Sequence, residues 1–209
     1  MNSKVIGIML ILGPILTMGV WIVYGVSTED MTPSQSMAAL LAEANKAETG
    51  SILQVFGVMS MFTGLYLLAR SLKSDNVVSN TFAEIGGLFL LLCVPIWVVM
   101  MGSDISAIEQ AEKFGNDVGA TILTASKVLQ MGAILMVVGL LLLGISLTLL
   151  RKYKGIIGIL FVIASICAFI DMVSGQDNAV FDVISMIGWM GLFLTTLVTG
   201  ILTTIQKES

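Results

Sequence analysis

Six long apolar stretches alternate with short polar segments along the chain. They cover about residues 5–26, 52–69, 85–102, 121–150, 156–170 and 183–205. A helix of about 20 apolar residues crosses the hydrocarbon core of a bilayer, which is about 30 Å thick. The pattern therefore predicts an all-α fold: a polytopic membrane bundle of six transmembrane helices that forms one domain over residues 1–209.

The clearest part of this pattern is the stretch 128–170, where two apolar runs are separated by only five residues. Those five include three charges, Arg151, Lys152 and Lys154. Each charge at the centre of a membrane costs about 2.5–3.5 kcal/mol, so the turn must lie outside the hydrocarbon. The stretch therefore predicts a membrane hairpin with a basic turn.

The polar segments also contain helix signals. Thr32 before Pro33 is typical of an N-cap followed by proline at the first helical position. Four apolar residues then recur at helical spacing, which predicts a short amphipathic helix on the membrane surface: Met37, Leu40, Leu41 and Ala44. Residues 103–116 form a second acidic, helix-like loop. Thr81 and Glu84 resemble a capping box that would begin the third span.

Lysine and arginine are unevenly distributed across the predicted membrane, which the positive-inside rule uses to assign orientation. Seven of these residues lie on the side of the termini: Lys4, Arg70, Lys73, Arg151, Lys152, Lys154 and Lys207. The other three lie on the opposite side: Lys46, Lys113 and Lys127. We therefore expect a multi-pass protein of the plasma membrane with both termini cytoplasmic and the acidic loops outside.

The composition supports this class and excludes several chemistries. The chain is 56% hydrophobic and 11% charged, with a mean hydropathy of +0.99. A net charge of −4 argues against nucleic acid as a partner. Without histidine, the chain alone cannot build a His-ligated haem, a zinc hydrolase or a His-based acid/base pair. No phosphate-binding loop or nucleophile elbow is present, so we predict no catalytic residue and no cofactor.

Five residues are candidates for a polar or ionic cluster in the membrane. Lys127, Asp171 and Asp182 lie at the outer ends of the fourth, fifth and sixth spans, where they would either form ion pairs or flank the lipid headgroups. Gln54 and Gln130 lie deeper. An unpaired amide in hydrocarbon costs several kcal/mol, so each needs a neighbouring helix or a bound solute as its partner.

One face of the sixth span is rich in small and hydroxylated residues, at i, i+3, i+4 and i+7 spacing: Thr196, Thr199, Gly200 and Thr203. Small residues allow helices to approach closely, and threonine hydroxyls can bond to their own helix carbonyls. We expect this threonine face to form a helix-packing seam rather than the lining of a pore.

Methionines gather in the outer halves of the predicted spans, where thioethers serve either as Cu(I) ligands or as adaptable packing material. Met59 and Met61 point about 200° apart on a helix, and Met100 and Met101 about 100° apart. No single helix therefore presents a chelating pair, and we prefer packing against lipid or a partner to a metal site.

The segment Leu-Leu-Leu-Gly-Ile-Ser, followed by Leu-Leu-Arg-Lys and Gly-Ile-Ile-Gly-Ile-Leu, occupies residues 141–160. It resembles the middle hairpin of uncharacterised six-span membrane families of bacteria and archaea. The resemblance implies a six-span fold. Those families have no assigned activity, so no activity and no functional residue is carried over to this chain.

Three functions remain open at this point, in descending order. The first is a non-catalytic accessory or scaffold subunit that packs against partner subunits, or against its own copies, through its outer side. The second is a transporter or channel for a small neutral or cationic solute, attracted by the acidic loops. It would show a polar cavity reaching Gln54, Gln130 or the Thr196 face. The third is an enzyme acting on lipid, for which Asp171 and Asp182 are the pair to inspect.

Overall fold

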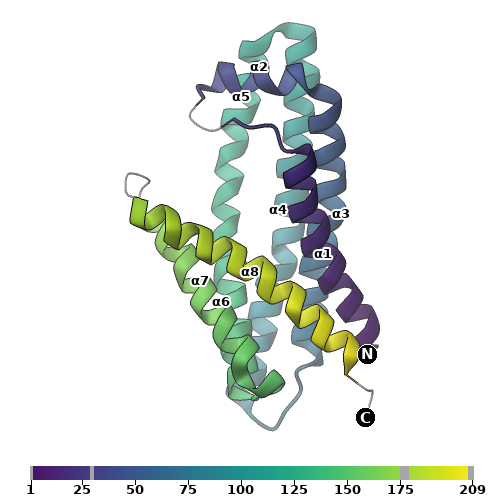
Figure 1. Ribbon diagram of the computed structural model, residues 1–209, viewed down its shortest axis with the longest axis vertical. Coiled ribbons are helices and arrows are strands. Elements are labelled where there is room, and N and C mark those ends of the chain that lie inside the picture. The colour runs from purple at the N-terminus through teal and green to yellow at the C-terminus, as the bar shows by residue number, and fades with distance from the viewer. Residues whose placement is uncertain (1, 29–30, 175–178, 207–209) are drawn as a thin grey trace.

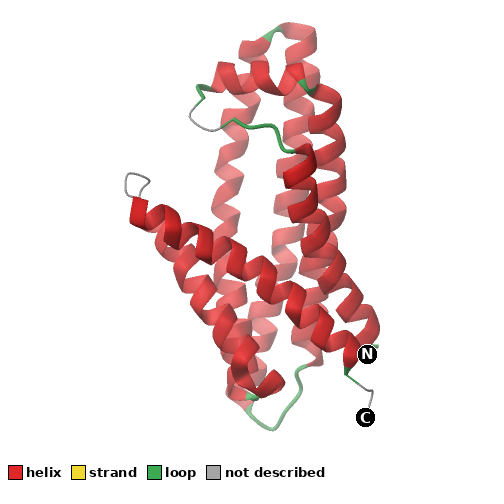
Figure 2. Cartoon of the chain, in the orientation of Figure 1, coloured by secondary structure: helices red, strands yellow, loops and turns green. Residues whose placement is uncertain are grey.

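The computed structural model describes residues 2–28, 31–174 and 179–206, without the side chains of residue 171 and residues 173–182. Its regular elements, all helical among the described residues, are shown in Figures 1 and 2. They are α1 (Ser3–Tyr24), α2 (Pro33–Ala42), α3 (Ala44–Ser71), α4 (Val77–Phe114), α5 (Asn116–Ser126), the 3₁₀ turn η1 (Lys127–Gly132), α6 (Ala133–Leu149), the 3₁₀ turn η2 (Lys152–Gly155), α7 (Ile156–Ser174) and α8 (Ala179–Ile205).

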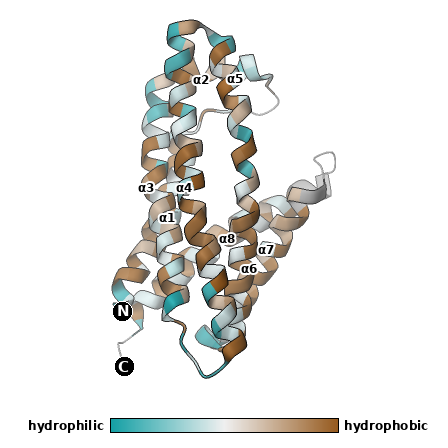
Figure 3. Ribbon diagram, turned by 180° about the vertical axis from the view of Figure 1, so that it is seen from behind, coloured by the Kyte–Doolittle hydropathy of each residue, from teal (hydrophilic) through white to brown (hydrophobic). Residues whose placement is uncertain are grey.

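Six helical segments among the described residues are long and apolar enough to cross a bilayer, which confirms the predicted all-α, six-span pattern. They are α1, α3, α4, α7, α8 and the fourth segment, which runs from α5 through η1 to α6. Hydrophobic residues dominate the middle of the molecule, and hydrophilic residues gather towards its two ends (Figure 3). The chain is therefore a multi-pass membrane protein.

The six segments pack in a closed circuit. α1 lies against α3, α3 against α4, α4 against α6, α6 against α7, α7 against α8, and α8 returns to α1. The chain termini and the turns after α3 and α6 all lie at one end of the molecule (Figure 1). About half-way towards the opposite end, α7 and the start of α8 diverge from the other helices, and the bundle is widest at that level, below α2 and α5 (Figures 1 and 3).

The circuit encloses an apolar core that extends from the middle of the bundle towards the end with the termini. We call it the basal core, and its fully buried members include Leu10, Phe62, Leu65, Leu90, Leu143 and Phe161. Close helix contacts surround it. A Cβ at Gly200 of α8 would lie 2.8 Å from the Leu10 backbone of α1, so only glycine permits this approach.

Helices α3 and α4 are much longer than the predicted spans 52–69 and 85–102. α4 has 38 residues, about 57 Å at 1.5 Å per residue, so it extends far beyond a hydrocarbon core of about 30 Å. Its end packs with α2, α5 and the start of α3 around a second apolar core, which we call the head: Met37, Ala47, Ala107, Ile108, Ala111 and Ala120. α2 begins at Pro33 after the N-cap Thr32. The position of α2 at a membrane surface stays a prediction.

Two local predictions are wrong. The third spanning helix does not begin at a capping box of Thr81 and Glu84. It begins four residues earlier, at Val77, because the Asn76 side chain accepts the Ser79 N–H, and Thr81 bonds back to the Val77 carbonyl within the helix. The fourth span is not one continuous α-helix over 121–150, since η1 interrupts it. None of the six residues of η1 is buried, so side-chain packing does not hold them in α geometry.

Candidate functional site

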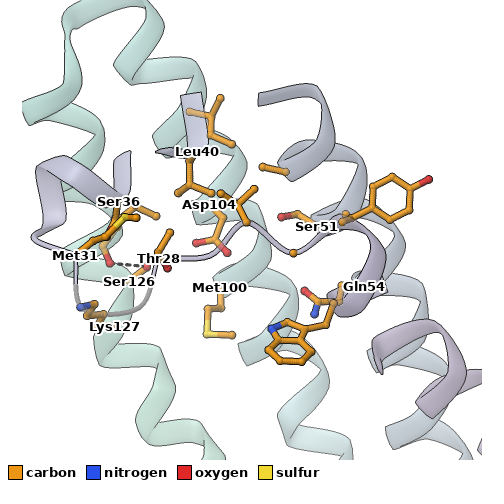
Figure 4. A pocket seen from close by; sticks show the side chains of 18 of the residues that line it. Thr28, Met31, Ser36, Leu40, Ser51, Gln54, Met100, Asp104, Ser126 and Lys127 are labelled. Atoms are coloured by element: carbon orange, nitrogen blue, oxygen red, sulfur yellow. Dashed lines mark hydrogen bonds between the residues drawn. The ribbon is translucent and has the colours of Figure 1, made fainter. Parts of the chain in front are cut away.

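A cavity of about 360 Å³ lies where the head meets the spanning bundle. Its walls come from the end of α1, the segment that follows α1, α2, the first half of α3, the second half of α4, α5 and η1 (Figure 4). It forms because the head holds the ends of α3, α4 and α5 around α2.

Asp104 lies in the middle of this cavity. In Figure 4 its carboxylate has Ser51 and Gln54 on one side and Ser126 and Lys127 on the other. The side chain is half-buried. Among the described residues, no hydrogen bond or ion pair reaches its carboxylate. A carboxylate partly removed from water and left without a partner is unfavourable to the fold, so it calls for a functional explanation.

Lys127 is the cation of the cavity. It is the first residue of η1, is exposed, and lines the cavity wall. The one ion pair within the described ranges joins Lys46 to Glu43 at 2.7 Å, so the Lys127 ammonium is not within 4.0 Å of Asp104. One cavity therefore holds two opposite charges that do not neutralise each other directly.

Two amides and several hydroxyls complete the polar lining. Gln54 of α3 and Gln130 of η1 both line the cavity, half-buried and exposed respectively. The serines and threonines of the lining are Thr28, Ser36, Ser51, Thr124 and Ser126. The Thr124 and Ser126 hydroxyls donate to carbonyls of their own helix, at 2.8 and 2.9 Å.

Apolar side chains form the rest of the wall. They include Val20 and Trp21 of α1, Leu40 of α2, and Met100 and Ile108 of α4. The lining of the cavity is therefore a mixture of polar and apolar side chains.

Three of the five residues predicted as a polar cluster line this one cavity: Lys127, Gln54 and Gln130. The side chains of Asp171 and Asp182 lie outside the described residues, so their part in such a cluster stays a prediction.

The sequence analysis missed Asp104, which it treated as one of several acids in a polar loop. The available signal was helical spacing. Met100, Asp104, Ile108 and Ala111 recur on one face of α4, and Ile108 and Ala111 are buried in the head. That short apolar stripe continues the helix past the predicted end of the span and turns Asp104 inwards.

The threonine face lies elsewhere. Thr196, Thr199 and Thr203 are buried, and each hydroxyl donates to the carbonyl four residues earlier at 2.6–2.8 Å. Gly200 lies against α1, and the Tyr153 hydroxyl is 2.6 Å from that of Thr203. None of the four residues lines the cavity.

The methionines are spread over several environments. Met31 and Met100 line the cavity, whereas Met61, Met101 and Met136 are buried in helix contacts. Within the described residues, no three His, Cys, Asp or Glu side chains come together to hold a metal ion.

Comparison of the chain with protein-family models, with curated proteins and with solved structures finds no match. The case for a function therefore depends on the geometry of the cavity.

Proposed function

We propose that this membrane protein binds a small polar solute in the cavity between the head and the bundle, as part of a transport function. The observation that supports this most directly is the convergence of Asp104, Lys127, Gln54 and Gln130 on one cavity of about 360 Å³. A polar cavity that reaches the two glutamines is the feature expected of a transporter.

The state of the two charges favours binding over a structural role. A carboxylate that is partly removed from water gains from a hydrogen-bonded or charged partner, and Asp104 has none among the described residues. Asp104 and Lys127 stay apart although they line the same cavity. A solute that bonds to both would supply the missing partners.

The shape of the bundle suits a site that opens on one side. Towards the termini the helices close on the basal core, whose members are fully buried apolar side chains such as Phe62 and Phe161. Transport would then require a second arrangement of the helices. The 3₁₀ turn η1 interrupts the fourth span beside the cavity, and such interruptions often mark hinges.

Orientation is part of the proposal. The turns that contain Arg70, Lys73, Arg151, Lys152 and Lys154 would be cytoplasmic by the positive-inside rule, together with both termini. The cavity would then face the outside of the plasma membrane. Labelling intact cells with a membrane-impermeant maleimide tests this: Gln110→Cys should react, and Ser74→Cys should react only after lysis. The reverse pattern would contradict the orientation.

Binding is tested by the thermal stability of the purified protein in lipid nanodiscs with a panel of amino acids, amines, carboxylates, sugars and nucleosides. A ligand at 100 times its Kd stabilises the folded state by about 2.7 kcal/mol, which a melting curve detects. Ser51→Trp should fill the cavity and abolish the shift. Ile52→Trp is the matched control, because Ile52 is 51% exposed and does not line the cavity. Equal shifts in both variants, or none in the wild type, would contradict the proposal.

The accessory-subunit function, which the sequence favoured, remains an alternative without separate geometric support. The exposed apolar side chains of spanning helices contact lipid as readily as protein. Gentle purification followed by native mass spectrometry separates the two: a stoichiometric partner protein favours the subunit, and a lone chain with a bound solute favours the proposed function.

A further inference from the structure

We infer that the ligand of this cavity is a zwitterion, a small molecule with an ammonium group for Asp104 and an anionic group for Lys127. This inference rests on the proposed function and adds the chemical class of the solute.

The balance of charge in the cavity is the first argument. Among the described residues, its lining contains one carboxylate, Asp104, and one ammonium, Lys127. A purely cationic ligand would satisfy Asp104 and be repelled by Lys127, and a purely anionic ligand would be repelled by Asp104 and satisfy Lys127. A neutral ligand would give neither of these two groups a counter-charge. A ligand with both signs complements this pair of charges.

The hydrogen-bonding capacity of the two groups gives the same answer. An ionised carboxylate only accepts hydrogen bonds, and a lysine ammonium only donates them. Asp104 therefore requires a donor on the ligand, and Lys127 requires an acceptor such as a carboxylate or a phosphate. Such charge-assisted bonds are about twice as strong as neutral ones.

The two charges belong to different elements, which hold them apart. Asp104 is fixed on α4, whose next turn packs into the head through Ile108. Lys127 begins η1, on the opposite wall of the cavity (Figure 4). Because no ion pair joins them directly, both stay available to a molecule that lies between them.

The remaining lining suits the rest of such a molecule. Ser51 and Gln54 on the Asp104 side and Ser36 and Ser126 on the Lys127 side offer further polar contacts (Figure 4). Met100 and neighbouring apolar side chains leave room for a small apolar substituent. A volume of about 360 Å³ is at the lower end for ligand pockets, which limits the occupant to a small molecule or headgroup.

Two sources supply this chemistry: a free α-amino acid and a zwitterionic lipid headgroup. The experiment uses nanodiscs of anionic phosphatidylglycerol, so that no zwitterionic lipid competes. Melting temperature and calorimetric titration are measured with a set of α-amino acids, with their amides as cations, with their N-acetyl derivatives as anions, and with phosphoethanolamine. In a separate arm, phosphatidylethanolamine is added to the nanodisc.

We expect stabilisation by zwitterions and none by the matched amides or N-acetyl derivatives. Stabilisation by amino acids alone identifies a free solute, and stabilisation by phosphoethanolamine and phosphatidylethanolamine alone identifies a headgroup. Asp104→Asn and Lys127→Gln should each weaken binding about tenfold, the effect of losing a hydrogen bond to a charged group. Glu109→Gln and Lys113→Gln, which alter charges on α4 outside the cavity, should bind as the wild type does.

The failures of the two proposals are distinguishable. Binding of a sugar, a simple amine or an amide without any zwitterion would overturn the zwitterion inference and leave solute binding intact. Loss of binding in Asp104→Asn together with unchanged binding in Lys127→Gln would also overturn the zwitterion inference and leave solute binding intact. Absence of stabilisation by every compound in both panels would overturn both. If Asp104→Asn does not fold, Lys127→Gln tests the same claim from the other wall.

Discussion

Several polar side chains in the basal half differ from the two charges beneath the head in having partners within the protein. In the basal half, the threonines of α8 donate to their own helix carbonyls, and Ser79 of α4 donates to the Ser146 carbonyl of α6 at 3.2 Å. Beneath the head, Asp104 and Lys127 line a cavity and do not pair. The basal half is a closely packed apolar core, and the region beneath the head contains a cavity with two charges that are not paired with each other.

The two parts also differ in how closely α7 and α8 approach the rest of the bundle. Glycines allow α8 to contact α1 and α6 to contact α7 closely in the basal half. Near the head, α7 and α8 diverge from α5, and η1 has no buried residue. Substitutions should therefore change stability most in the basal half and binding most beneath the head.

The largest loss of stability is expected for Phe161→Ala, which removes a fully buried ring from the basal core. The cavity left behind should destabilise the fold by about 3–5 kcal/mol. Phe169→Ala, on the same helix but 48% exposed, is the control. Unfolding in mixed detergent micelles measures both. Equal effects would mean that the ring of Phe161 does not fill a closed core.

A smaller loss is expected for Gly200→Val, because the new side chain meets the Leu10 backbone of α1. Overpacking of this kind costs about 1–3 kcal/mol. Gly19→Val is the control, since a Cβ there meets no atom within 4 Å. Thermal melts in nanodiscs compare the two variants. An unchanged melting temperature in Gly200→Val would show that α1 and α8 are not in close contact.

Tyr153→Phe should have a modest effect. It removes the hydrogen bond between Tyr153 and Thr203, 2.6 Å long, and should destabilise the fold by about 1 kcal/mol. Tyr66→Phe, for which no such bond is seen in the described structure, should change stability less. Thermal melts in nanodiscs measure the stability of both variants. A larger loss of stability in Tyr66→Phe than in Tyr153→Phe would contradict a stabilising role for the hydrogen bond between Tyr153 and Thr203.

The smallest effect on stability is expected for Asp104→Asn without ligand. The carboxylate has no partner among the described residues, so neutralising it should leave the melting temperature unchanged or slightly higher. Glu109→Gln is the matched control on α4. A marked loss of stability in Asp104→Asn would show that the carboxylate has a structural role.

The sequence was sufficient for the number of spans, because six apolar runs of about the length that crosses the hydrocarbon core recur along it and the charges of residues 151–155 cannot lie in the membrane. It also predicted the start of α2 from Thr32 and Pro33. These features depend on local composition, which a single sequence shows directly. The sequence did not show how far α3 and α4 continue beyond that core.

The candidate site depended on contacts between distant segments, and only part of it was predictable. Gln54, Gln130 and Lys127 were noticed as polar residues in apolar surroundings. Asp104 was not, because its helical stripe is short and its neighbours are acidic. The sequence of the 3₁₀ turn η1 also suits an α-helix, so the interruption of the fourth span was not predictable from it.

The central claim is that a solvent-accessible binding cavity lies above a sealed basal core. Single cysteines at Gln54 and at Leu143, in a chain with Cys93 and Cys167 replaced by alanine, test it with a water-soluble maleimide on the folded protein in nanodiscs. We predict that Gln54→Cys reacts, that a bound zwitterion slows the reaction, and that Leu143→Cys, in the fully buried basal core, does not react. Equal labelling at both positions, or labelling of Leu143→Cys alone, would contradict the account.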